Sequence, residues 1–134
     1  MDAITIKRYR QLLKGGFKYS GTLENPTVYL NSQGERLRIC AHAVHNYIYL
    51  YLNISGEMIE DIKYLCQCTP ATNIAVEILC GLVKGKTIAE AEALTENDFA
   101  LELGSRDEEF LEKARGAIEL FNRAMSHYRG GVKA

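Results

Sequence analysis

The sequence lacks an excess of charge of either sign, and this absence narrows the classes of partner. Its 134 residues include 16 Lys and Arg against 17 Asp and Glu, a formal net charge of −1. Nucleic acids and anionic membranes select basic proteins or basic patches. We therefore expect neither nucleic acid nor a membrane as a partner, and we interpret Arg36, Arg38, Lys84 and Lys86 as solvated surface.

Long apolar runs are also missing. No stretch approaches the roughly 20 apolar residues that span a bilayer. The first eight residues, MDAITIKR, lack the apolar segment of a secretion leader. The default expectation is a cytoplasmic protein. Thiols stay reduced in that compartment, so the four cysteines favour metal or sulfur chemistry over structural disulfides.

Motifs of several enzyme classes are absent. The sequence has no glycine-rich phosphate loop, no G-x-S-x-G turn and no H-E-x-x-H pair. Glu57, Glu60 and Asp61 are close in sequence but lie at a predicted turn, where a solvated edge explains them better than acid–base chemistry. A nucleophilic pair of Cys40 and His42 lacks an evident orienting group. The motifs therefore give no positive evidence for catalysis.

The patterns that are present predict one α+β domain over residues 1–134. Helical spacing predicts an N-terminal helix within residues 1–16. Helices also fill the second half, including a buried helix over residues 71–83 and a long last helix that Gly130–Gly131 would end, leaving residues 129–134 as a tail. Hydroxyl residues placed three positions before a carboxylate predict helix starts at Thr87, Thr95 and Ser105.

Strand patterns cover residues 35–43, 45–54 and 58–65, and residues 28–30 suggest one more short strand. Short connections are typical of an antiparallel meander. We predict a two-layer sandwich in which a three-stranded antiparallel meander carries helices packed on one face. Side chains of the middle strand alternate, with Tyr47, Tyr49 and Tyr51 on one face and Ile48, Leu50 and Leu52 on the other. Both faces of this strand are therefore apolar, and we expect helices over one face and an aromatic rim on the other.

Two cysteines stand where the third strand pattern gives way to a helix. Thr69 suits the N-cap of that helix and Pro70 its first position. A thiol at a helix N-terminus experiences the positive end of the helix dipole, which favours the thiolate that binds soft metals. The alternative is that Cys66 and Cys68 are small buried apolar side chains. Their spacing alone does not decide between these interpretations.

Cys40 and His42 are two residues apart on a predicted strand, so they would project from one face. If that strand end meets Cys66 and Cys68, the four side chains supply three sulfurs and one nitrogen. Such a set suits tetrahedral zinc or an iron–sulfur cluster. The spacing C-x-H…C-x-C is not a standard zinc-finger pattern. Taken alone, His42 is a surface histidine, and Cys80 lies at a buried helical position and belongs to the core.

A longer run of sequence points to a family. Residues 68–91, CTPATNIAVEILCGLVKGKTIAEA, together with Gly21-Thr22-Leu23-Glu24, residues 59–63 and Cys40-Ala41-His42, resemble the IscU/NifU iron–sulfur cluster scaffold family. The resemblance covers most of residues 20–127. It implies a scaffold that is not an enzyme, on which Cys40 and one of Cys66 or Cys68 hold a transient [2Fe–2S] cluster or zinc. It also implies a cysteine desulfurase as sulfur source and iron–sulfur acceptor proteins as recipients.

The chain departs from the family pattern at the site. His42 stands where the family has aspartate, and the family's third cysteine, on the last helix, falls at about Glu109–Phe110. One hypothesis is that Cys66 supplies the missing thiolate, which gives the metal ligands Cys40, His42, Cys66 and Cys68. The others are a degenerate member that acts as a protein-interaction module, and a sulfur acceptor that carries a persulfide on Cys68 without metal.

Overall fold

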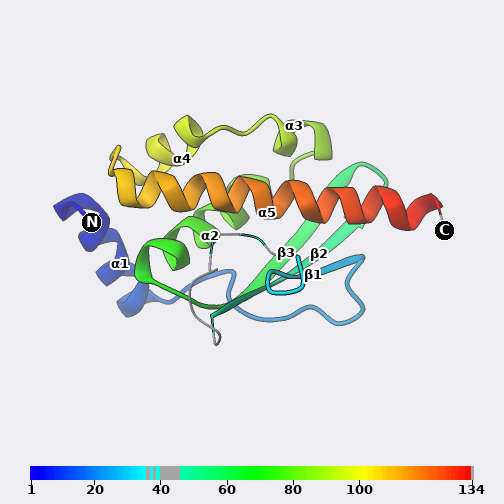
Figure 1. The fold of residues 1–134 in the computed structure, drawn as a ribbon, viewed down its shortest axis with the longest axis horizontal. Helices are drawn as coiled ribbons and strands as arrows, with labels where there is room; N and C mark the ends of the chain where they lie inside the picture. The colour runs from blue at the N-terminus through cyan, green and yellow to red at the C-terminus, as the bar shows by residue number, and fades with distance from the viewer. Residues whose placement is uncertain (36, 38, 40–45, 134) are drawn as a thin grey trace.

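The computed structural model describes residues 1–35, 37, 39 and 46–133. Within them the chain forms five helices and three strands (Figure 1). In chain order these are α1 (Ala3–Gly15), β1 (Val28–Asn31), β2 (Tyr47–Ser55), β3 (Met58–Gln67), α2 (Pro70–Val83), α3 (Ile88–Glu92), α4 (Glu96–Leu103) and α5 (Glu108–Lys133).

The three strands form one antiparallel sheet in the order β1-β2-β3. Helices α2 and α5 pack against each other over the sheet, and α5 runs along the length of the molecule (Figure 1). The short helices α3 and α4 lie beyond them, and α1 lies at the end opposite to the last turn of α5. The predicted α+β sandwich with a three-stranded antiparallel meander is confirmed.

The identity of the first strand differs from the prediction. The sheet begins with β1, whose Leu30 pairs with Leu50 of β2, and the strand predicted over residues 35–43 is wrong at its described positions. Glu35 lies in a turn, and neither Leu37 nor Ile39 belongs to a strand. Both are nonetheless buried, with 4% and 3% of their surface exposed. The alternating pattern therefore records two apolar side chains that a loop inserts into the core.

Alternate residues of β2 point to opposite sides, as the sequence predicts. Ile48, Leu50 and Leu52 are fully buried beneath the helices. The other side carries an aromatic cluster in which the rings of Tyr47 and Tyr49 stack at 4.4 Å. In the same cluster, Tyr29 of β1 lies 5.2 Å from Tyr51 and 6.1 Å from Tyr49. The predicted aromatic face is confirmed.

A β-bulge explains an irregular pattern in β3. Ile59 and Ile62 are both fully buried although they are three residues apart, which strict alternation forbids. The pairing with β2 shifts register between Asn53 and Ile54. The extra residue in β3 returns both isoleucines to the helix-covered face.

Helix α2 begins as the sequence predicts. Thr69 is its N-cap, with the hydroxyl accepting from the backbone N–H of Thr72 at 3.4 Å, and Pro70 occupies the first turn. Most of the helix is buried between the sheet and α5 because it is apolar nearly all round. Cys80 is fully buried, which confirms its assignment to the core.

Two of the three predicted helix starts are confirmed. The Thr87 hydroxyl accepts from the N–H of Glu90 at 3.1 Å, and the Glu90 carboxylate accepts from the N–H of Thr87 at 2.9 Å. At α4 the carboxylate of Asp98 accepts from the N–H of Thr95 at 2.8 Å. The start predicted at Ser105 is wrong. The cap of α5 is Asp107, whose carboxylate accepts from the N–H of Phe110 at 2.9 Å.

The predicted end of the last helix is also wrong. Helix α5 continues through Gly130 and Gly131 to Lys133. A glycine inside a helix costs only about 1 kcal/mol, which tertiary contacts can offset. The Tyr128 hydroxyl donates to the carbonyl of Gly56 at 2.9 Å, and Arg129 forms an ion pair with Glu92 of α3. These contacts hold the last turns in place.

Gly116 of α5 allows a close approach that positions the loop residue Ile39. A Cβ built on Gly116 would lie 2.9 Å from the Cβ of Ile39. We expect Gly116→Ala to destabilise the fold by about 1–2 kcal/mol, because the overpacking exceeds the gain in helix propensity. Urea unfolding measures this change. Gly15→Ala is the control, since a Cβ there meets nothing within 4 Å, and an equal loss in both variants would contradict the prediction.

Candidate metal centre

The two cysteines of the predicted site lie on either side of the end of β3. Cys66 belongs to the strand and pairs with Ile48 of β2, while Cys68 lies in the connection to α2. Both are partly buried against the core. The first turn of α2 follows directly, so the cysteines stand at the strand-to-helix junction that the sequence predicts.

Cys66 is a protonated thiol near neutral pH. Its Sγ donates to the side-chain oxygen of Asn73 on α2 at 2.9 Å, and burial raises its pKa to about 12. The expected lowering by the helix N-terminus is therefore wrong for this cysteine, because desolvation outweighs the dipole. A metal would have to displace the thiol proton and the contact with Asn73.

The reactivity of Cys66 tests this description. We expect iodoacetamide to alkylate Cys66 in the native protein at pH 8 at least about 100-fold more slowly than in the protein unfolded in guanidinium, because the thiolate is the reactive form. Peptide mass mapping after timed quenching measures the rate at Cys66. Comparable rates in the two states would show that the thiol is exposed and acidic.

Cys68 differs from its neighbour. Its Sγ lies 3.5 Å from the carbonyl oxygen of Tyr47, the first residue of β2, and the sulfur is in a disulfide in the structure. Cys66 and Cys80 are free thiols. Because a metal binds the thiolate, metal binding by Cys68 requires reduction of its disulfide.

Cys40, His42 and His45 lie outside the described residues, so the meeting of the four predicted ligands stays a prediction. The described residues on both sides of residues 40–45 lie near the strand-to-helix junction. Ile39 accepts at its carbonyl from the hydroxyl of Thr72, in the first turn of α2, at 3.5 Å. The chain is described again from residue 46, and Tyr47 lies beside Cys68.

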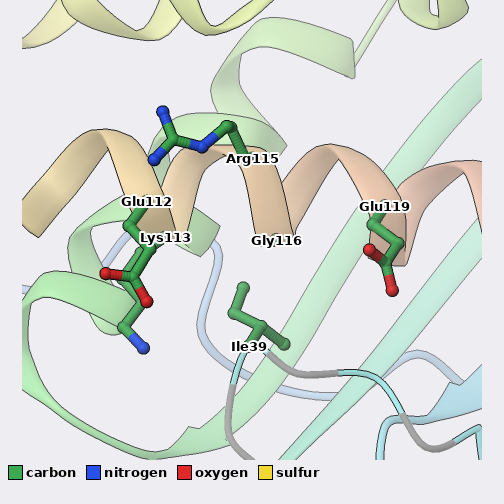
Figure 2. A pocket seen from close by; sticks show the side chains of 6 residues that line it. All are labelled: Ile39, Glu112, Lys113, Arg115, Gly116 and Glu119. Atoms are coloured by element: carbon green, nitrogen blue, oxygen red, sulfur yellow. The ribbon is translucent and has the colours of Figure 1, made fainter. Parts of the chain in front are cut away.

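A cavity of about 240 Å³ lies between Ile39 and α5 (Figure 2). The side chain of Ile39 points toward Gly116, and Glu112 and Glu119 line the cavity on the two sides of this contact. Arg115 extends to the other side of the helix, where it forms ion pairs with Glu96 and Glu108 at 2.6 and 2.8 Å. The cavity next to Ile39 is therefore lined by charges of both signs, because Lys113 and Arg115 line it together with the two carboxylates.

The helix position that the resemblance assigns to the third cysteine lies elsewhere. Phe110 is fully buried in the core, and Glu109 accepts from the N-terminal amine at 2.8 Å. Neither lines the cavity beside Ile39. In the part of the chain that the structure describes, no three His, Cys, Asp or Glu side chains gather into a metal-binding group. A metal site that used Cys66 and Cys68 would therefore need ligands from beyond these residues.

Sequence reasoning missed three residues that organise the junction. Thr72 anchors Ile39, Asn73 accepts from Cys66, and Gly116 admits Ile39 against α5. Thr72 and Asn73 are polar residues in the first turn of a mostly apolar helix, which was the available signal. Nothing local distinguishes Gly116, because its role depends on a residue far away in the sequence.

Comparison with known proteins agrees with this arrangement. Residues 20–134 match the family model described as the NifU-like N-terminal domain. The chain therefore belongs to this family, and the resemblance to IscU/NifU proteins is confirmed. No curated protein sequence matches. Among the described residues, no helix is both long and apolar enough to cross a membrane.

Solved structures share the fold. One is a protein from Fervidobacterium islandicum AW-1 assigned as an iron–sulfur cluster assembly scaffold for the SUF system, at 14% identity and a TM-score of 0.66, covering 93% of this chain and 96% of that one. Another is the N-terminal part of a nitrogen-fixing NifU-like protein from Brucella abortus, at 13% identity and a TM-score of 0.62, covering 96% and 94%. A hypothetical protein is 18% identical with a TM-score of 0.59, covering 90% and 98%.

Proposed function

We propose that this protein is a scaffold for iron–sulfur cluster assembly, which holds a transient [2Fe–2S] cluster and passes it on without acting as an enzyme. The family supports the general role. The observation that carries the proposal for this chain is the contact of Thr72 with the carbonyl of Ile39. It brings the residue before Cys40 to the helix turn that follows Cys66 and Cys68.

The proposed ligands are Cys40, His42, Cys66 and Cys68. Three thiolates and one imidazole fit an iron–sulfur cluster or zinc and disfavour magnesium or calcium. We assign Cys40 and Cys68 the main role, because Cys66 must first give up its proton and its bond to Asn73. An imidazole in place of the family's aspartate favours stable binding over rapid transfer, since neutral histidine is a common ligand of zinc and iron.

The proposed partners follow from the cargo. A cysteine desulfurase would supply sulfur, and iron–sulfur acceptor proteins would receive the cluster. Thiolate ligands require reduced cysteines, so the proposal includes a reducing compartment such as the cytoplasm.

Metal analysis of the reduced protein, purified without chelator or an affinity metal, tests the function. Near-stoichiometric iron with visible absorption supports the cluster scaffold, and colourless protein with one equivalent of zinc supports zinc as the cargo. Chelation should then lower the melting temperature, because a ligand of the native state adds to its stability. A persulfide on Cys68 without metal would favour the sulfur acceptor. Absence of metal and persulfide, including after incubation with ferrous iron and sulfide, would favour the interaction module.

A further inference from the structure

A second cavity, of about 300 Å³, opens between α1, α2 and α4. Among the residues that the structure describes, no cysteine lines it. Its walls include the apolar side chains of Leu12, Ile78 and Leu82, together with charged side chains from all three helices. Cavities that bind small molecules combine an apolar lining with a few placed polar groups, and this volume is at the small end of their range of roughly 300–1,000 Å³.

Glu77 places a buried carboxylate in this cavity. It lies in the middle of α2 and only 7% of its surface is exposed. Its Oε1 accepts from the Tyr64 hydroxyl at 2.9 Å and from the backbone N–H of Tyr19 at 3.3 Å. Within the described part of the chain, Oε2 has no hydrogen-bond partner. Every fully buried side-chain nitrogen or oxygen there has one, so Oε2 is not fully buried. Oε2 therefore keeps access to solvent, and Glu77 is among the residues that line the cavity.

Arg8 lines the same cavity from α1. One guanidinium nitrogen donates to the carbonyl of Glu102 at 2.8 Å. Among the described residues, neither Arg8 nor Glu77 forms an ion pair. Glu77 and Arg8 thus place opposite charges in one cavity without an ion pair between them, and Glu102 of α4 adds a second carboxylate to its lining. A buried charge is costly unless it is paired, so an occupant that pairs Glu77 would gain from that contact, and the half-buried Arg8 offers a second contact of opposite sign.

We propose that this cavity binds an α-amino acid with an apolar side chain. The ammonium group would meet Oε2 of Glu77, and the carboxylate would meet the guanidinium of Arg8, which suits carboxylates because of its planar fork of donors. The apolar side chain would lie against Leu12, Ile78 and Leu82. A zwitterion can pair with both Glu77 and Arg8, whereas a simple amine or a simple acid can pair with one of them.

Three ligands of one shape test the charge pattern. L-Leucine carries both charges, 3-methylbutylamine lacks the carboxylate, and 4-methylpentanoate lacks the ammonium group. We expect L-leucine to cause saturable chemical-shift changes in the amides of α1 and α2, and each single-charge ligand to bind at least about tenfold more weakly. Absence of saturable binding of L-leucine, or equal binding of the three ligands, would overturn the proposal.

Matched variants assign the two charges. Glu77→Gln keeps an oxygen that accepts from Tyr64 and Tyr19, so the fold has its hydrogen bonds while the charge is gone. This variant should weaken the binding of L-leucine at least about tenfold and leave the binding of 4-methylpentanoate unchanged. Arg8→Gln should weaken the binding of L-leucine and leave the binding of 3-methylbutylamine unchanged. This variant also tests the site if Glu77→Gln fails to fold. Glu112→Gln is the control, because Glu112 lines the cavity beside Ile39 and not the cavity between α1, α2 and α4. Full L-leucine affinity in Glu77→Gln or Arg8→Gln would refute the assigned contacts.

Discussion

The Cys68→Ser variant is expected to retain less than about a tenth of the iron or zinc that the unmodified protein binds after reduction and reconstitution. Loss of outer-shell partners alone costs a metal site about 10–100-fold in affinity, and loss of a thiolate ligand should cost at least as much. Serine is small and leaves the N-cap Thr69 in place, so the start of α2 should survive. Metal content per chain and visible absorption measure the effect.

Two other cysteine variants make this result specific. Cys66→Ser should reduce metal content by a smaller factor, because binding at Cys66 is opposed by its raised pKa and its bond to Asn73. Cys80→Ala should leave metal content unchanged, since Cys80 is fully buried in the core, and it controls for general damage to the fold. Normal metal loading of Cys68→Ser, with a native melting curve, would remove Cys68 from the site.

Phe110→Ala should destabilise the protein by about 3–5 kcal/mol. The ring is fully buried in the main core, and truncation leaves a cavity that close-packed neighbours fill only in part. Residue 110 also follows the Asp107 cap of α5, whose bond to the Phe110 N–H does not need the side chain. The loss should therefore come from packing and not from an altered helix start.

Urea unfolding measures the change in the free energy of unfolding. Leu101→Ala is the control, because 73% of Leu101 is exposed and its truncation should change stability by less than about 0.5 kcal/mol. A loss below about 1 kcal/mol in Phe110→Ala would place the ring outside the core. A loss of about 3–5 kcal/mol would instead support a structural role for residue 110 in this chain. The resemblance places the third cysteine of the family at about this position.

Local patterns in the sequence were enough for the features that depend on neighbouring residues. Thr69 and Pro70 start α2, Thr87 and Glu90 cap α3, and the alternation in β2 separates the tyrosine face from the core. Each of these features is set by hydrogen bonds or periodicity over a few residues. Residues 68–91, with the run Val83-Lys84-Gly85-Lys86-Thr87, were likewise enough to identify the family.

Features that depend on distant residues were decided by the tertiary structure. The apolar alternation around Leu37 and Ile39 suits either a strand or a buried loop, and the pairing of Leu30 with Leu50 gives the first strand to Val28–Asn31 instead. The same holds for the pKa of Cys66, where burial outweighs the helix dipole. A linear pattern records which residue types are present, whereas desolvation and close contact depend on what the rest of the chain packs against them.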